Sequence, residues 1–222
     1  DMSFWALELG APVSIEAFSA DGKGAMTDVS PPTWSTITYT FKKGNDEIKY
    51  VWYDGYKDAI FNEEKWALES KDYPGNKPRT RNLPPQEILE GQPDDEGKGY
   101  GTVMVGTDGK LWFNRSKDNW FVKPSNKLDG WDWPEQSIPR ARGENPHNEF
   151  FDAVKAGDPK GALSNFHHAG PFTEMVLLGN LAVKHNKKVE WDAKTLSSPN
   201  TPEAASMIRR QYRDGWKIDV NV

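Results

Sequence analysis

The chain has no cysteine among its 222 residues. This absence excludes disulfide bonds, thiolate zinc sites and a cysteine nucleophile. It leaves the compartment open, because cytosolic and periplasmic proteins can both lack cysteine.

Long hydrophobic runs and a basic surplus are also missing. No stretch approaches the roughly 18 consecutive apolar residues of a transmembrane helix, so we expect no membrane span. The 28 Lys and Arg residues stand against 33 Asp and Glu residues, which gives a net charge of −5. A mildly acidic chain without a basic run is a poor partner for nucleic acid or for an anionic membrane.

A dinucleotide-binding fingerprint is absent as well. The stretch 97–101, GKGYG, holds three glycines, but Thr102 occupies the position of the third glycine of such a fingerprint. The stretch also precedes a predicted strand, whereas a phosphate loop follows a strand and opens a helix. We therefore expect no NAD or NADP bound to this chain alone.

Aromatic residues, in contrast, are plentiful, with 10 Trp, 7 Tyr and 10 Phe. Each ring buries roughly 150–250 Å² when packed, so a globular core is expected. Apolar alternation and turn residues predict strands at 12–20, 35–41 and 47–53 and a hairpin at 101–115. Helix periodicity and capping residues predict helices at 147–157, at about 171–185 and from Thr201 to Trp216.

Strands that come first and helices that come later predict an α+β fold, with an open, mostly antiparallel sheet and helices packed on one face. We expect a single domain over 1–222, with a long irregular insertion loop at 54–98. The first ten residues are typical of the end of an amphipathic helix, so we expect the chain to begin inside an element. Aromatic and β-branched residues on the open sheet face predict an apolar patch and hence a homo-oligomer through that face.

Two adjacent histidines, His167 and His168, precede the main predicted helix. We expect Pro171 to begin that helix, which leaves both histidines on an extended segment where neighbours point to opposite sides. This spacing disfavours a metal site, since a helical metal pair needs residues four apart. Either the histidines form a polar entry to a core helix, or one of them lines a substrate pocket.

Three tryptophans, Trp120, Trp131 and Trp133, fall in a predicted loop rich in proline and glycine. Exposed aromatic rings there could stack on a sugar ring. Packing of the loop or a contact between subunits is the interpretation that we favour.

Six segments, in this order, resemble the C-terminal domain of Gfo/Idh/MocA-family oxidoreductases, and most closely their long bacterial, sugar-related branch. They cover almost the whole chain, from Asp1 to about Trp216. The segments are FWALELGAPVSIEA, PPTWSTITYTF, YGTVMVGTDGKLWF, IPRARG with HNEFFDAVKAGD, SNFHHAGPFTEMVLLGNLAVKHNKKVEWD and TPEAASMIRRQYRDGW.

This resemblance implies a protein with two domains that have different roles. In the family, an N-terminal Rossmann domain binds NAD or NADP and carries the catalytic Lys, and a D-x-G-x-H segment just beyond it carries an Asp and a His. The C-terminal domain shapes the substrate site and commonly mediates oligomerisation. The resemblance therefore implies that the Rossmann domain lies outside this chain, which has no catalytic, cofactor-binding or metal-binding residue and is inactive alone.

The parent protein implied by the resemblance is an NAD(P)-dependent oxidoreductase acting on a sugar, a cyclitol or a related polyol, or a relative that cleaves glycosides through transient oxidation. The resemblance also implies candidate substrate-pocket residues around the entry to the long helix and at the pocket edge. These are Asp1, Asn165, His167, His168 and Glu174, with His147 and Arg140 as further candidates. The alternative is a non-catalytic carbohydrate-binding or assembly module that uses its tryptophans and its open sheet face.

Overall fold

The computed structural model divides into two compact units. The first unit comprises Asp1–Glu8 and Leu83–Phe172, and the second comprises Leu9–Asn82 and Thr173–Val222. The single domain expected over 1–222 stays a prediction, and the two units are described separately below. The residues described are 1–21, 25–27, 30–90, 101–114, 120–132, 134–209 and 211–216.

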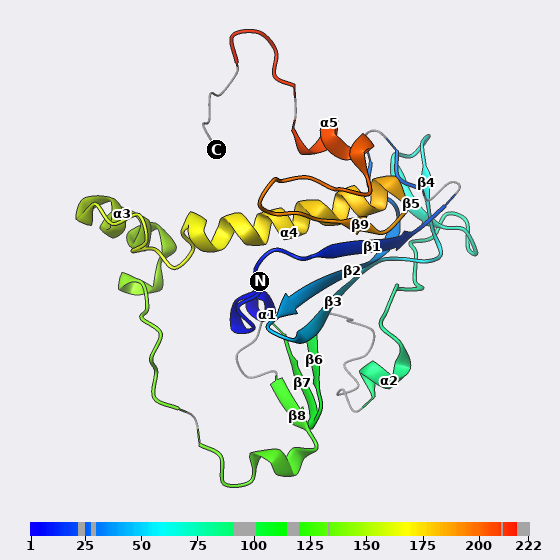
Figure 1. Ribbon diagram of the computed structural model, residues 1–222. Coiled ribbons are helices and arrows are strands. Elements are labelled where there is room, and N and C mark those ends of the chain that lie inside the picture. The colour runs from blue at the N-terminus through cyan, green and yellow to red at the C-terminus, as the bar shows by residue number, and fades with distance from the viewer. Residues whose placement is uncertain are drawn as a thin grey trace. The chain divides into compact units, whose positions relative to one another are not determined.

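The second unit is built on a four-stranded sheet, called the main sheet below, with the strand order β3-β2-β1-β9 (Figure 1). All of its pairings are antiparallel, and they confirm the three strands predicted in the first 53 residues. Gly44 turns the chain between β2 and β3 with a φ of +62°, which glycine adopts without strain. The strands are β1 (Ser14–Ser19), β2 (Trp34–Lys43), β3 (Asp46–Gly55) and β9 (Val189–Glu190).

Alternation along the strands places the core on one face of the main sheet. Ile15, Tyr39 and Phe41 are buried there. The long helix α4 (Phe166–His185) packs on this face through its second-unit part, with Leu178 and Ala182 among its buried residues. The α+β prediction, with antiparallel strands and a helix on one face, is therefore confirmed.

The predicted irregular loop at 54–98 contains regular structure in its described part. A two-stranded hairpin forms from β4 (Ala59–Asn62) and β5 (Ala67–Ser70), followed in the first unit by α2 (Gln86–Leu89). The prediction is thus wrong for the hairpin, because proline and glycine around it masked two short strands. Residues 91–98 lie outside the described residues.

Asp58 holds this hairpin to the segment that follows. Its carboxylate is 2 % exposed and accepts hydrogen bonds from the Ser70 hydroxyl at 2.8 Å and from the backbone N–H of Thr80 at 2.9 Å. The backbone N–H of Arg79 donates to it as well, at 3.1 Å. Burial alone raises the pKa of Asp58, but these hydrogen bonds outweigh burial and lower it. Asp58 is a structural anchor, since it has partners on every side.

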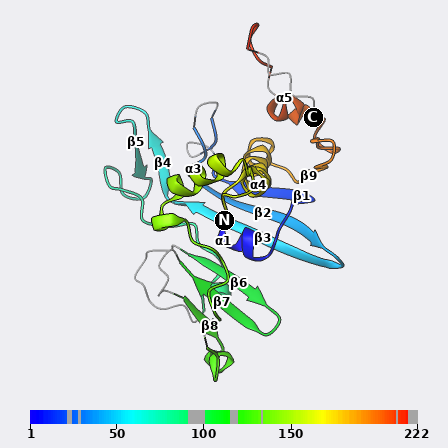
Figure 2. The same cartoon turned by 90° about the vertical axis from the view of Figure 1, so that its left-hand side faces the viewer.

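The first unit contains a three-stranded antiparallel sheet in the order β6-β7-β8 (Figure 2). Trp112 is buried in it and stacks on Phe121 across the strands, with 5.3 Å between the ring centroids. The predicted hairpin at 101–115 is confirmed, whereas Trp120, expected in a loop, lies in a strand. The strands are β6 (Thr102–Gly106), β7 (Gly109–Phe113) and β8 (Trp120–Lys123).

The helices follow the sequence prediction in part. α3 (Pro146–Ala156) is confirmed and ends at Gly157, which has a φ of +65°. The last predicted helix, from Thr201 to Trp216, is wrong beyond Ile208, because one short 3-10 turn and one α-helical turn end at that residue and the described residues after it are not helical. None of the helices within the described ranges is long and apolar enough to cross a membrane. The remaining elements are α1 (Met2–Ala6), η2 (Ser125–Leu128), η3 (Arg142–Glu144), η4 (Pro202–Ala204) and α5 (Ala205–Ile208).

Candidate functional site

Two of the predicted site residues, Asp1 and His168, are in direct contact within the first unit. The Nε2 atom of His168 lies 2.9 Å from the Oδ1 atom of Asp1, which is a hydrogen-bond distance. The His168 side chain is 24 % exposed and that of Asp1 is 64 % exposed. The ring is therefore largely enclosed, while the carboxylate stays open to solvent.

Three aromatic rings enclose the imidazole of His168. Phe172 stacks on it almost in parallel, with 6.4 Å between the centroids and an interplanar angle of 6°. The rings of Phe4 and Trp5, both on α1, lie 6.2 Å and 6.0 Å from it. This arrangement sets the polar edge of the imidazole, with its bond to Asp1, between apolar rings.

The early start of α4 explains why His168 occupies this position. The helix begins at Phe166 and not at Pro171, because the side chain of Asn165 accepts a hydrogen bond from the backbone N–H of His167 at 2.9 Å. The prediction of an extended segment is therefore wrong. In a helix, residues four apart share a face, so His168 stacks on Phe172 while His167 is exposed.

Glu174 has a different partner. Its Oε1 atom accepts a hydrogen bond from the indole Nε1 of Trp191 at 2.7 Å, and Trp191 is buried. Both residues belong to the second unit, where this bond ties α4 to the end of β9. The structure thus gives Glu174 a role in packing, apart from the group around His168.

His147 and Arg140 are both exposed and have no contact with the group around His168 in the described structure. Arg142, which was not a predicted site residue, has a defined partner. Its guanidinium binds Asp152 through two hydrogen bonds of 3.1 Å and 3.0 Å, and these raise the pKa of Arg142. Hydrogen bonds of this forked kind need the folded α3, so no sequence signal indicated them.

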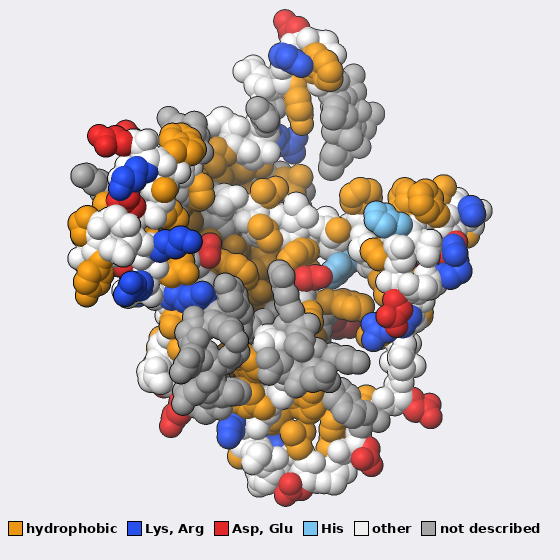
Figure 3. All heavy atoms as spheres, turned by 180° about the vertical axis from the view of Figure 1, so that it is seen from behind, with side chains coloured by type: hydrophobic (Ala, Val, Ile, Leu, Met, Phe, Trp, Pro, Cys, Tyr) orange, Lys and Arg blue, Asp and Glu red, His pale blue; other side chains and the backbone are white. Residues whose placement is uncertain are grey.

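Hydrophobic side chains gather on α3 and at the start of α4 (Figure 3). A surface of this kind is rare on a monomer and suits contact with another protein surface. The exposed residues are Phe150, Phe151, Val154, Leu163 and Phe166.

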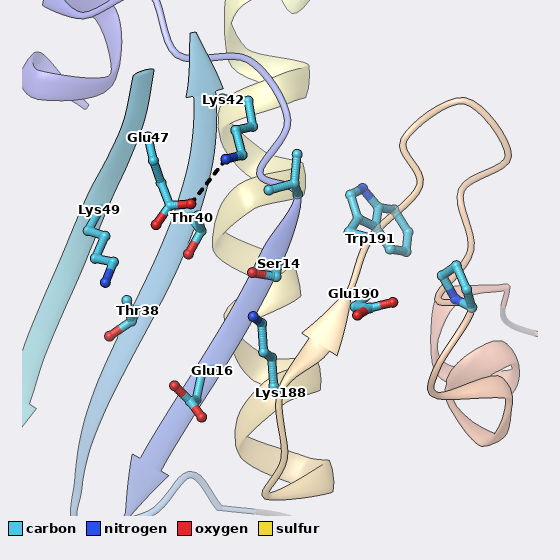
Figure 4. Close-up of a pocket in the computed structure, with 12 residues that line it drawn as sticks. Ser14, Glu16, Thr38, Thr40, Lys42, Glu47, Lys49, Lys188, Glu190 and Trp191 are labelled. Carbon is cyan, nitrogen blue, oxygen red and sulfur yellow. Dashed lines mark hydrogen bonds and ion pairs between the residues drawn. The ribbon is translucent and has the colours of Figure 1, made fainter. Parts of the chain in front are cut away.

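The open face of the main sheet carries a polar groove with a volume of about 500 Å³ (Figure 4). Hydroxyl groups of Ser14, Thr38 and Thr40 form its floor, and α4 lies behind the sheet. Three lysines and three glutamates surround these hydroxyls, so the charges balance. The charged residues are Glu16, Lys42, Glu47, Lys49, Lys188 and Glu190.

Lysines converge on Glu47 in this groove. Lys42 donates a hydrogen bond of 3.1 Å to its carboxylate. That bond lowers the pKa of Glu47, and the nearby charges of Lys49 and Lys188 lower it further. An apolar patch was expected on this face, but the threonines of β2 and the charged side chains of the neighbouring strands make the described groove polar. The predicted oligomer remains a prediction.

Two of the three tryptophans of the predicted loop meet in the first unit. Trp131 is 45 % exposed and contacts the edge of Trp120, with 5.8 Å between the centroids and an interplanar angle of 68°. The exposed carboxylates of Asp129 and Asp132 flank Trp131 in sequence. Trp133 lies outside the described residues.

A metal ion and a dinucleotide each need a recognisable arrangement of protein groups. No group of three or more His, Asp or Glu side chains in this part of the chain could hold a metal ion. The residues before α2, α3, α4 and α5 are Pro85, Asn145, Asn165 and Ala204. None of these four helices begins at a glycine-rich loop of the kind that binds a dinucleotide.

Comparison with known proteins identifies no relative. No family model, no curated protein and no solved structure matches the chain.

Proposed function

We propose that the chain is the substrate-side and assembly domain of an NAD(P)-dependent oxidoreductase of the Gfo/Idh/MocA type. The parent protein would act on a sugar, a cyclitol or a related polyol, or would cleave a glycoside through transient oxidation. In this proposal, a Rossmann domain of the same protein holds the cofactor and the catalytic groups. This chain contributes the wall of the substrate pocket and does not turn over substrate alone.

The contact between Asp1 and His168 is the observation that carries the proposal. The resemblance assigns both residues to one pocket, although they stand 167 positions apart in the sequence. A carboxylate beside an imidazole between aromatic rings can bind polyol hydroxyls, because the rings cover C–H faces and the polar atoms exchange hydrogen bonds. The exposed apolar surface on α3 and the start of α4 supports a contact with a further domain.

A direct test uses a longer polypeptide that carries an upstream strand followed by G-x-G-x-x-G, continuous with Asp1. In it, His168→Phe keeps the aromatic packing but removes the hydrogen bond to Asp1. The phenyl ring also cannot bind a polyol hydroxyl, and loss of that hydrogen bond, about 1.4 kcal/mol, raises the KM for the polyol about tenfold and leaves the KM for the dinucleotide unchanged. The exposed neighbour provides the matched control, since His167→Phe leaves both KM values unchanged.

Two results contradict the proposal. One is saturable, low-micromolar binding of NADH or NADPH to the chain alone, together with turnover. The other is an upstream reading frame that encodes an unrelated domain.

The second candidate function is a non-catalytic carbohydrate-binding module. It is favoured by the half-exposed Trp131, set against Trp120 and next to two carboxylates, since exposed indoles stack on sugar rings. Retardation of the chain in gels containing soluble polysaccharide, abolished by Trp131→Ala, supports this candidate. Unchanged mobility across a panel of polysaccharides rejects it.

A further inference from the structure

A second pocket, called the loop pocket below, lies in the second unit between the loop that follows β9 and the helical turns η4 and α5 (Figure 1). Its volume is about 310 Å³, which is at the lower end of the range for small-molecule sites. It shares no lining residue with the groove on the main sheet and includes none of the residues around His168.

The larger part of the wall of the loop pocket is apolar. It is formed by Leu196, Pro202, Ala205 and Ile208. Leu196 has a φ of +49°, a conformation that residues other than glycine seldom adopt and that costs on the order of 1 kcal/mol. The loop holds its one leucine in this conformation at the wall of the pocket, which therefore offers a surface to an apolar group.

Asn200 holds the loop against the edge of the main sheet. Its Oδ1 atom accepts hydrogen bonds from the backbone N–H of Glu190 at 2.8 Å and from the hydroxyls of Ser198 and Thr201 at 3.1 Å and 3.2 Å. Its Nδ2 atom donates to the backbone carbonyl of Lys188 at 2.8 Å. These bonds fix the polar wall of the pocket before any ligand binds, and such preorganisation lowers the entropic cost of binding.

The same hydrogen bonds leave one hydroxyl hydrogen in surplus. Oδ1 of Asn200 has two lone pairs but three donors, and the backbone N–H makes the shortest of the three bonds. Ser198 and Thr201 both line the pocket and compete for the second lone pair. Thr201 is fully buried, whereas Ser198 is 6 % exposed, so the Ser198 hydroxyl is the one that can donate to a ligand.

Arg209 is the charged side chain among the residues that line the loop pocket. It is exposed, and its guanidinium has no hydrogen bond or ion pair within the described part of the chain. The acidic residues of the segment 192–209 are engaged elsewhere. Asp192 accepts a hydrogen bond of 2.9 Å from the backbone N–H of Lys194, and Glu203 pairs with Lys187 at 2.6 Å. The pocket therefore carries a positive charge that no neighbouring carboxylate compensates.

From this charge and the apolar wall we infer that the loop pocket binds a small organic carboxylate with an apolar body. The guanidinium of Arg209 binds the carboxylate, a geometry that arginine favours, and the Ser198 hydroxyl donates a further hydrogen bond. The apolar body packs on Leu196 and Ile208. This site goes beyond the proposed function, since it needs neither the dinucleotide nor the polyol.

Two probes of the same shape and different charge test the site. Benzoate carries the carboxylate, and benzamide is its neutral counterpart. In an amide NMR titration of the chain, benzoate should bind saturably with a Kd on the order of 1 mM, as expected for so small a ligand. Benzamide should bind at least about tenfold more weakly. The shifted amides should centre on residues 195–198 and 205–209.

Substitutions in and beside the pocket locate the binding. Arg209→Gln should weaken benzoate about tenfold and leave benzamide unchanged. The matched control is Arg213→Gln, since Arg213 is exposed, lies outside the pocket and has its guanidinium 4.7 Å from the ring centroid of Trp216. This control should leave the binding of benzoate unchanged. Ala205→Phe should abolish the binding of both probes, because the exposed Ala205 can carry a ring that fills the pocket without disturbing the core.

The inference is overturned if benzoate gives no saturable shifts up to about 10 mM, if benzamide binds equally well, or if the shifts centre elsewhere. It is also overturned if Arg213→Gln weakens benzoate as much as Arg209→Gln, or if Ala205→Phe binds as the unaltered chain does. Should Arg209→Gln fail to fold by circular dichroism, the comparison of the two probes and Ala205→Phe decide. None of these results changes the KM test of His168, and failure of that test leaves benzoate binding as it is.

Discussion

Replacing Gly179 by alanine tests how closely α4 packs on the main sheet. A Cβ atom at position 179 would overlap the hydroxyl oxygen of Tyr39 and come within 3.2 Å of Cδ1 of Ile37. Tyr39 is 4 % exposed and packs edge-on against Tyr50, so its ring has little room to move. Either the ring or the helix must shift when the methyl group is added.

The expected cost follows from two opposing effects. Overpacking a tight core contact costs about 1–3 kcal/mol. Alanine inside a helix gains about 1 kcal/mol over glycine. Gly179→Ala should therefore lower the free energy of unfolding by up to about 2 kcal/mol, measured by urea denaturation at neutral pH.

A second substitution reverses the sign of the effect. Tyr39→Phe removes the oxygen that the new methyl group meets, and the nearest remaining atoms, Cζ of residue 39 and Cδ1 of Ile37, lie at 3.2 Å, which small shifts accommodate. In that background, Gly179→Ala should be neutral or stabilising by up to about 1 kcal/mol. Gly170→Ala, in the same helix but with open space around the new Cβ, should stabilise alone. Stabilisation by Gly179→Ala in the unaltered background would refute the packing.

Two further predictions concern buried ionisable groups. Asp58→Asn places amide donors against the N–H groups of Arg79 and Thr80 and should cost about 3 kcal/mol of unfolding free energy, whereas exposed Asp46→Asn stays within about 0.5 kcal/mol. The pKa of Asp58 is lowered, so the stability that its carboxylate contributes is present above about pH 4 and is lost as the pH falls through the folded pKa. In urea titrations at acid pH, the Asn variant should therefore lose less unfolding free energy than the unaltered chain. Burial, and to a lesser degree the charge of the neighbouring Tyr50, raises the pKa of Tyr39 to about 12. The stability that the neutral Tyr39 contributes is therefore complete below about pH 10 and is lost as the pH rises toward 12. Urea titrations at pH 9 and pH 11 should show a loss of about 1 kcal/mol that Tyr39→Phe removes; equal losses in both proteins would contradict the shifted pKa.

Local periodicity made most of the fold predictable. Alternation with period two located β1, β2 and β3, and a glycine with positive φ closed α3 where the sequence indicated. These features depend on neighbours within a few residues. The start of α4 was not predicted, because Pro171 is a strong helix-start signal, while the cap at Asn165 is a single polar residue that also favours turns.

The candidate sites were less accessible from sequence, because they depend on contacts over long distances along the chain. The resemblance implied that Asp1 and His168 are pocket residues, but only the structure shows the 2.9 Å distance between Nε2 of His168 and Oδ1 of Asp1. It also nominated Glu174, whose bond to Trp191 is a packing contact. The groove on the main sheet had a sequence signal, the alternation of threonine with apolar residues along β2, but that pattern is equally typical of a solvated face.

The two faces of the main sheet differ, because one packs tightly against α4 and the other is open to solvent. On the side of α4, the contact between Gly179 and Tyr39 leaves no room for one added methyl group, so that face holds the helix and offers no site. On the open side, a row of short hydroxyl side chains leaves the groove shallow, and the charged side chains around it reach outward. A shallow face with long charged side chains is poorly suited to enclose a small substrate but well suited to a second flat surface. The face toward α4 is thus closed by packing, and the open face carries a shallow polar groove.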